Sequence, residues 1–307
     1  MSEKLFLAIG EAMVELSQAE GGLWRMGFAG DTLNTAWYVR ACLPSEWRVS
    51  FFTRLGTDPF SQRMMDFLGS NEIDTQFIAR DPERTVGLYS IELHDGERSF
   101  SYWRGQSAAR RLADDEAALE AAIGAADVVY FSGITLAILE PDRRAALLRL
   151  VGKARAEGKL TVFDPNIRQR LWENAEAMRT CLTAAAATAA IALPSFDDEA
   201  SVFGDAGIKD CAARWLKSGA GEVVVKNGGG PVAVSMPGGA IEVLTFESVK
   251  PVDSTGAGDS FNGGYLAARL GGAAPDEAAS QGHAVAARVV RHPGALMPRD
   301  QIAPVRR

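Results

Sequence analysis

The chain has 307 residues, of which 47% are hydrophobic and 23% charged, so its composition is globular and excludes a disordered or fibrous protein. Its 32 basic and 39 acidic residues give a net charge of −7, which argues against a nucleic-acid partner and against binding to an anionic membrane. Cys42, Cys181 and Cys211 form no Cys-x-x-Cys pair, which disfavours a disulfide framework or a structural zinc site. Residues 1–11 are too poor in apolar residues for a signal-peptide core, so we expect a soluble, cytoplasmic protein.

Short apolar and β-branched runs alternate with segments of helical length along most of the chain. Six runs are predicted to be strands: residues 4–10, 49–56, 127–133, 159–164, 190–194 and 222–228. Residues 140–158, 255–270 and 275–291 are predicted to be helices. Near-continuous apolar strands are typical of a parallel sheet that is buried on both faces. The alternation therefore predicts an α/β, doubly wound fold, with a mostly parallel central sheet flanked by helices.

Two segments depart from this pattern. Residues 12–28 are rich in glycine with alternating apolar residues, and residues 86–104 alternate around Asp95 and Gly96, a strong hairpin signal. We expect these segments to form a small β-sheet lid within a single domain that spans residues 1–307. Because such a sheet has exposed edges, which tend to pair with other chains, we also expect a homo-oligomer, a dimer or higher.

The most informative segment is residues 252–264, which read VDSTGAGDSFNGG and precede a predicted helix. Gly256, Ala257 and Gly258 would leave backbone N–H groups uncovered at the positive end of that helix, where an anion is stabilised. We expect Ser254 or Thr255 to cap the helix. Asp259 would then lie inside an anion site, which is electrostatically unfavourable unless the carboxylate acts as a base. The alternative is that the glycines only permit close helix packing.

Two common nucleotide-binding motifs are absent. The chain has no G-x-x-x-x-G-K-[ST] segment, which excludes a P-loop nucleotide hydrolase. Phe261 occupies the place of the third glycine of the dinucleotide-binding fingerprint, and the segment lies near the carboxyl end of the chain, not after its first strand.

Two segments carry a resemblance to a known family. Residues 253–259 read DSTGAGD and residues 27–34 read GFAGDTLN. They resemble the two signatures of the ribokinase-like (PfkB) sugar kinases, with Ser254 where threonine is usual, and the resemblance extends over essentially the whole chain. It implies the ribokinase-like fold and the use of ATP. Further segments are similar to those of the family's 2-keto-3-deoxygluconate kinases: GDTLNTA (30–36), GERSFSYWR (96–104), SGITLAIL (132–139), FDPNIRQRLW (163–172), EVVVKNGG (222–229) and GALMPR (294–299).

The resemblance implies roles for particular residues. Asp259 would be the general base, and Gly256, Ala257 and Gly258 would stabilise the transferred phosphoryl group. Arg104 and Arg168 would hold the carboxylate of a sugar acid, since a guanidinium binds a carboxylate through two hydrogen bonds. The groups expected on the sugar hydroxyl and carbonyl oxygens are Gly30, Asp31, Asn34, Tyr89 and Tyr102. The alternatives are ordinary strand positions for Tyr89, Tyr102 and Arg104 and a surface cation for Arg168.

The nucleotide would lie at the carboxyl ends of the strands. The residues expected there are Asn166, Lys226, Asn227, Gly228, Gly229 and Gly230, with a plain hairpin turn as the alternative for the last five. Mg²⁺ is implied because the phosphates of ATP need charge neutralisation, and a monovalent cation such as K⁺ is compatible with the family. Many of these kinases carry an Asn-x-x-Glu motif, but residues 193–200 read LPSFDDEA. Glu199 is the candidate metal ligand, unless the acidic cluster only marks a helix N-terminus.

These expectations describe an ATP-dependent sugar-acid kinase that converts 2-keto-3-deoxygluconate to its 6-phosphate. A kinase of a neutral sugar is less favoured, because it would leave a buried guanidinium without a partner. A nicotinamide-dependent oxidoreductase shares the α/β pattern but lacks its fingerprint. A sugar-acid sensor without catalytic activity would have no need of Asp259.

Overall fold

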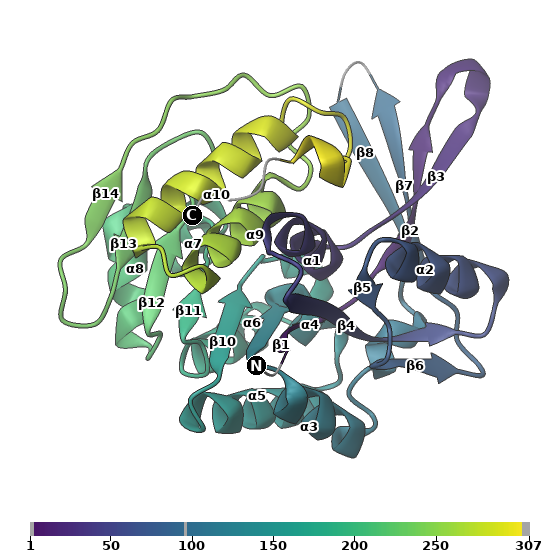
Figure 1. Cartoon of the computed structure of the whole chain (residues 1–307), viewed down its shortest axis with the longest axis horizontal. Helices are drawn as coiled ribbons and strands as arrows, with labels where there is room; N and C mark the ends of the chain where they lie inside the picture. Colours follow the sequence, from purple (N-terminus) through teal and green to yellow (C-terminus); the bar gives the residue numbers. More distant parts are fainter. Residues whose placement is uncertain (1–2, 95–96, 303–307) are drawn as a thin grey trace.

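The computed structural model describes residues 3–94 and 97–302. Its larger sheet has the strand order β14-β13-β12-β11-β10-β9-β1-β4-β5, and β6 pairs with β4 (Figure 1). The strands are β1 (Lys4–Ile9), β4 (Trp47–Gly56), β5 (Ile73–Asp74), β6 (Ile78–Asp81), β9 (Val128–Ser132), β10 (Leu160–Asp164), β11 (Ile191–Ala192), β12 (Glu222–Val225), β13 (Val232–Ser235) and β14 (Glu242–Leu244). The pairs from β5 to β12 are parallel, and β13 and β14 add antiparallel pairs at one edge. The predicted, mostly parallel sheet is confirmed.

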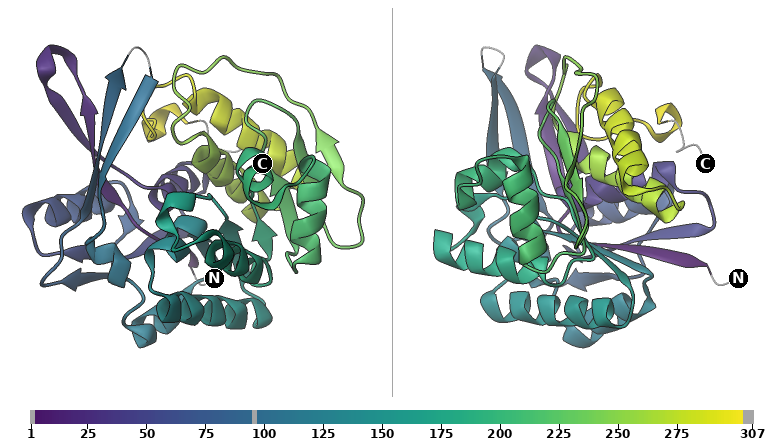
Figure 2. Two further views of the ribbon diagram at one scale, coloured as in Figure 1. Left: turned by 180° about the vertical axis from the view of Figure 1, so that it is seen from behind. Right: turned by 90° about the vertical axis from the view of Figure 1, so that its left-hand side faces the viewer.

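Helices cover both faces of this sheet (Figure 2). One layer contains α1 (Asp31–Cys42), α2 (Pro59–Ser70), α9 (Ala257–Leu270) and α10 (Pro275–Val289). The other contains α3 (Glu116–Ala125), α4 (Gly133–Ile138), α5 (Pro141–Ala156), α6 (Ala175–Ala186), α7 (Phe196–Phe203) and α8 (Ile208–Lys217). Alternate side chains of β1 explain the two layers, because Leu5, Leu7 and Ile9 pack in one core while Phe6 and Ala8 pack in the other.

Short 3₁₀ helices complete the described elements: η1 (Glu20–Gly22), η2 (Ala108–Arg111), η3 (Gln169–Leu171) and η4 (Arg299–Gln301). Among the described helices, none has both the length and the apolar character needed to cross a membrane.

A second, four-stranded sheet stands apart from the main body in Figure 1, and we call it the lid sheet. It consists of β3 (Trp24–Ala29), β2 (Met13–Gln18), β7 (Gly87–His94) and β8 (Glu97–Trp103), in that spatial order. The expected small separate sheet is therefore present, although the Asp95–Gly96 turn lies outside the described residues. Met13, Tyr89 and Ile91 on its inner face pack with Ala295 from the C-terminal segment. This contact directs the inner face toward the start of α9.

Candidate active site

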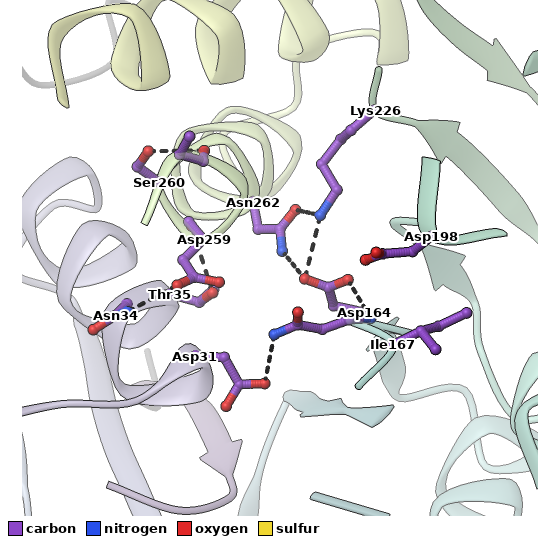
Figure 3. Close-up of polar contacts among 12 residues, drawn as sticks. Asp31, Asn34, Thr35, Asp164, Ile167, Asp198, Lys226, Asp259, Ser260 and Asn262 are labelled. Carbon is purple, nitrogen blue, oxygen red and sulfur yellow. Dashed lines mark hydrogen bonds and ion pairs between the residues drawn. The ribbon is translucent and has the colours of Figure 1, made fainter. Parts of the chain in front are cut away.

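The two signature segments meet where α1 and α9 lie side by side. The side-chain amide of Asn34 donates to the carboxylate of Asp259 at 2.8 Å (Figure 3). The close approach of the helices depends on Gly263, because a Cβ there would lie 2.4 Å from the Cβ of Tyr38. Residues far apart in the sequence thus form one site.

The loop before α9 is held by Asp253. One carboxylate oxygen of Asp253 accepts from the N–H of Thr255 at 2.8 Å, and the other accepts from the N–H of Gly294 at 2.6 Å. The expectation that Ser254 or Thr255 caps α9 is wrong, since Gly256 is the N-cap and no side chain bonds there. The Asp253 carboxylate therefore holds the loop that precedes α9 without capping the helix.

Gly256 is required by its conformation and by its surroundings. Its φ is +75°, in the left-handed region, and a Cβ there would lie 2.8 Å from the carbonyl oxygen of Ala295. The N–H of Ala257 bonds to the carbonyl of Ser254 at 3.2 Å, so this group is already used within the loop. The next N–H groups of the first turn have no partner within the helix and suit an anion.

The carboxyl group of Asp259 has a strongly altered acidity. Burial raises its pKa from 3.8 to about 7, the negative charge of Asp31 adds to the rise, and the hydrogen bond from Asn34 opposes it. A base whose pKa lies near neutral pH is well matched to accepting a proton from a hydroxyl group during catalysis.

A buried polar network lies behind Asp259, at the carboxyl ends of β10 and β12. The ammonium of Lys226 donates to Asp164 at 3.2 Å and to the side-chain oxygen of Asn262 at 3.0 Å. The amide of Asn262 donates to the same Asp164 oxygen at 2.6 Å (Figure 3). A Cβ at Gly258 would lie 3.6 Å from the Lys226 ammonium. This cation therefore adds its positive charge to the N-terminal end of α9.

Asn166 links this network to the N-terminal signature. Its side-chain amide donates to Asp31 at 3.0 Å, and its backbone N–H donates to Asp164 at 3.1 Å. Its φ of +31° is unusual for a residue other than glycine and marks a tightly determined turn. Burial raises the pKa of Asp31, while hydrogen bonds from Ser132 and Asn166 oppose the rise. Asn166 thus contacts a residue expected to bind substrate.

The glycines after Lys226 form a tight turn between β12 and β13. The N–H of Gly230 donates to the carbonyl of Asn227 at 2.7 Å, and Gly228 has a φ of +52°. The backbone is therefore that of a hairpin turn, and the expected contact of Asn227, Gly228, Gly229 and Gly230 with a nucleotide stays a prediction.

Two predicted tyrosines lie on the inner face of the lid sheet. Tyr89 is buried, Tyr102 is 54% exposed, and their rings stack with centroids 5.7 Å apart. Burial raises the pKa of the Tyr89 hydroxyl, and the charges of Glu15 and Asp259 raise it further. Tyr89 also packs with Ala295, which lies beside Gly256, so this face looks toward the start of α9.

The two predicted arginines differ in their surroundings. Arg104 is largely buried and forms an ion pair with Glu11. Arg168 is 53% exposed and lies 3.5 Å from the carboxylate of Asp198. Arg104 lies at the root of the lid sheet, and Arg168 lies in the segment after β10, beside Asp198.

Glu199 points away from this site. Its carboxylate is fully buried and accepts from Arg214 at 2.5 Å and from the indole of Trp215 at 3.1 Å. Asp205 and Cys211 lie close enough to share a metal ion with it, but the Arg214 guanidinium already donates to both carboxylates. Its position therefore gives no support to the expectation that Glu199 holds the metal of ATP.

The preceding residue, Asp198, faces the site instead. Burial raises the pKa of Asp198, the charge of Asp164 raises it further, and the charges of Arg168 and Lys226 lower it. Figure 3 shows Asp198 beside Asp164.

Glu11, Asp164, Asp198 and Asn262 were not predicted as site residues from the sequence. Two of these had a detectable signal. Asp164 follows directly on a buried strand, and Asn262 lies three residues after Asp259, on nearly the same side of a helix. Glu11 had no such signal.

The fold and the site are those of a phosphotransferase of the α/β class, with a buried carboxylate and a buried cation near the N-terminus of one helix. Residues 4–301 match the model of the pfkB family of carbohydrate kinases, and the chain belongs to this family. It is 41% identical to a 2-dehydro-3-deoxygluconokinase of Escherichia coli, with 98% of this chain and 99% of that protein covered. It is 39% identical to a 2-dehydro-3-deoxygluconokinase of Dickeya dadantii, with 97% and 98% covered.

A solved structure extends the similarity to the fold. The crystal structure of 2-dehydro-3-deoxygluconokinase from Thermotoga maritima superposes with a TM-score of 0.83, at 20% identity, over 97% of this chain and 98% of that one. The predicted ribokinase-like fold is confirmed.

Proposed function

We propose that this protein uses ATP to phosphorylate 2-keto-3-deoxy-D-gluconate, also called 2-dehydro-3-deoxygluconate, on its 6-hydroxyl group. The observation that carries the proposal is the Asp259 carboxylate, held by Asn34 at the start of α9 with the Lys226 ammonium beside the same helix end. The names of the relatives with 39% and 41% identity support the choice of substrate.

The reaction follows from this arrangement. Asp259 accepts the proton of the sugar hydroxyl while that oxygen forms a bond to the γ-phosphorus, and the bond from this phosphorus to the bridging oxygen of ADP breaks. The N–H groups of the first turn of α9 and the Lys226 ammonium stabilise the negative charge of the phosphoryl group. Asn166 and the 227–230 turn bind the phosphates and ribose of ATP.

The sugar acid lies between the lid sheet and α1. Arg104 and Arg168 bind its carboxylate, and the groups that bind its remaining oxygens are Gly30, Asp31, Asn34, Tyr89 and Tyr102. The stacked rings of Tyr89 and Tyr102 support this assignment because they line the lid face that looks toward Asp259.

Magnesium accompanies ATP in this proposal, and the residues present fit such an ion. Asp31, Asp164, Asp198 and Asp259 outnumber the nearby cations Lys226 and Arg168, and mutual repulsion contributes to the raised pKa values of Asp31, Asp198 and Asp259. Carboxylate oxygens are the ligands that Mg²⁺ prefers. Asp198 and Asp164 would hold the ion, which when bound neutralises phosphate charge. A monovalent cation such as K⁺ remains compatible with this scheme.

The experiment compares wild type with Asp259→Asn on four sugars: 2-keto-3-deoxygluconate, 2-keto-3-deoxygalactonate, fructose and ribose. We expect ATP-dependent turnover of the keto-deoxy acids, with kcat reduced by a factor of about 10²–10⁴ in the variant and KM little changed. Asp276→Asn, an exposed change on α10, is the control. Turnover of a neutral sugar alone would refute the substrate, and unreduced kcat in Asp259→Asn would refute the base.

We also propose that the protein is a homodimer joined through the outer face of the lid sheet. Trp24 and Trp103 are 46% and 62% exposed there. With Leu16, Leu88, Ser90 and Glu92 they line a cavity of about 380 Å³. Exposed aromatic side chains around a hollow are typical of an interface core. Light scattering should give a dimer for wild type and for Phe60→Lys, an exposed control, but a monomer for Trp103→Lys; a monomeric wild type would refute the interface.

We further place this activity in the cytoplasm. Cys42, Cys181 and Cys211 are buried and unpaired, which suits a reducing compartment.

A further inference from the structure

Glu11 lies at the root of the lid sheet, between the end of β1 and the start of β2. Its side chain is only 1% exposed, and its carboxylate accepts hydrogen bonds from the guanidinium of Arg104 and from the hydroxyl of Ser107 at 2.5 Å. Arg104 directly follows β8, where the chain leaves the lid sheet. One buried carboxylate therefore ties the segment that enters the lid sheet to the segment that leaves it.

The start of β7, which also lies at the root of the lid sheet, packs against Glu11 and Arg104. Gly87 is the first residue of β7, and a Cβ there would lie 2.9 Å from a carboxylate oxygen of Glu11 and 3.4 Å from the Cβ of Arg104. The start of β7 therefore packs directly against one side of the ion pair, and only glycine fits there without moving the Glu11 carboxylate.

The Arg104 guanidinium is only partly satisfied by Glu11. Its Nη2 atom bonds to Glu11, whereas its Nε atom is buried and has no hydrogen-bond partner among residues 3–94 and 97–302. A buried N–H group without a partner is costly, so an acceptor brought by a ligand would be bound with a gain in free energy.

This side chain lies on the inner face of the lid sheet. Alternation along the strand puts Arg104 on the same face as Tyr102, and the pairing of Tyr102 with Tyr89 puts both rings on that face. Tyr89 packs with Ala295, which lies beside Gly256 at the start of α9. The unpartnered Nε therefore belongs to the face that covers the site.

We propose that Glu11 is the positioning residue that makes the enzyme selective for a sugar acid. Glu11 holds the Nη2 group of the Arg104 guanidinium and leaves its Nε group for the carboxylate of the substrate. Because a fixed guanidinium binds a carboxylate with less loss of conformational freedom, the effect is confined to acidic substrates. This inference rests on the proposed sugar-acid kinase activity. The competing explanation is that Glu11 only holds the strands of the lid sheet together.

The test uses Glu11→Gln, which removes the charge at constant size. We expect the KM for 2-keto-3-deoxygluconate to rise by about tenfold or more, since a guanidinium no longer held by a charged partner binds a carboxylate less well. The KM for ATP should stay within about twofold, because the lid sheet does not carry the nucleotide groups. Ser107→Ala is the matched control, since it removes the other bond to Glu11 and leaves the ion pair intact.

A double-mutant cycle with Arg104→Gln separates the two explanations. If Glu11 acts through Arg104, the double variant should bind the sugar acid no worse than Arg104→Gln alone. Additive losses, or a Glu11→Gln variant whose two KM values rise together, would overturn the inference in favour of a purely structural role. Gly87→Ala keeps the charge but displaces the carboxylate. It should also raise the KM for the sugar acid selectively, which provides a test if Glu11→Gln does not fold.

Different results would refute the proposed function and the inference about Glu11. Wild-type protein that turns over no sugar acid would overturn the proposed function and this inference with it. Wild-type protein that does turn over the acid, with its KM unchanged in Glu11→Gln, would overturn the inference alone.

Discussion

Asn34 and Asp259 are separated by 225 positions in the chain, and the amide of the first donates to the carboxylate of the second at 2.8 Å. This hydrogen bond favours the charged form of Asp259, while burial and the charge of Asp31 favour the protonated form. The balance leaves the pKa of Asp259 at about 7. Asn34 therefore lowers the pKa of the proposed base.

The pH dependence of the reaction should report this balance. Asp259 accepts a proton only when it is ionised, so kcat/KM should rise with pH through about 7 and level off above it. Asn34→Ala removes the donor that favours ionisation, so the rise should move to higher pH. Initial rates measured between pH 5 and 9 test both points. A rise centred near the ordinary aspartate pKa, or one that Asn34→Ala leaves in place, would contradict this account.

The raised pKa of Asp259 also predicts that this carboxyl group lowers the stability of the fold at neutral and higher pH. Below about pH 4 the Asp259 carboxyl is protonated in both the folded and the unfolded chain, so it contributes no difference. Between pH 4 and 7 the unfolded chain ionises while the folded chain keeps its proton, and the folded state loses stability. Asp259→Asn should therefore raise the Tm at pH 8, with a gain that shrinks toward pH 4. An equal change in Tm at both pH values would show that the ionisation of Asp259 is not its cause.

The sequence predicted those parts of the fold that depend on local pattern. Strands β9 and β12 are buried on both faces, so their apolar runs were visible without any tertiary information. The start of α9 was also predictable, because glycines before a helix with an internal aspartate are an unusual local combination. Its N-cap was not, since Gly256 takes a left-handed conformation at a place where the distant Ala295 leaves no room for a side chain.

The sequence could not predict contacts that depend on tertiary direction. Asp198 and Glu199 are adjacent on α7, and successive residues of a helix point about 100° apart, so only one of them faces the site. Choosing between them required knowing where Arg214 lies. The pairing of Arg104 with Glu11 is likewise invisible in the sequence, since 93 positions separate the partners.

Lys226 should have both a structural and a catalytic role. The ion pair between Lys226 and Asp164 is buried, so Lys226→Met leaves an uncompensated carboxylate and should lower the free energy of unfolding by about 3–5 kcal/mol. Adding Asp164→Asn should restore most of this stability, because the unpaired charge is then removed. Activity should stay low in the double variant, since both the cation beside the first turn of α9 and a proposed magnesium ligand are then missing.

Urea unfolding and steady-state kinetics of Lys226→Met, of Asp164→Asn and of the double variant test this separation. Lys217→Met, an exposed change on α8, is the control and should alter neither quantity. Recovery of activity together with stability would mean that Lys226 only neutralises Asp164 and does not act on the phosphoryl group.

The dependence on magnesium should distinguish the two adjacent acids of α7. Asp198 faces Asp164 and Lys226, so Asp198→Asn should raise the Mg²⁺ concentration needed for half-maximal activity by about tenfold or more. Glu199→Gln should leave this concentration within about twofold of wild type, because the Glu199 carboxylate is held by Arg214 and Trp215 on the far side of the helix. The measurement is a Mg²⁺ titration of the initial rate at saturating ATP. The opposite ranking of the two variants would identify Glu199, and not Asp198, as the metal ligand.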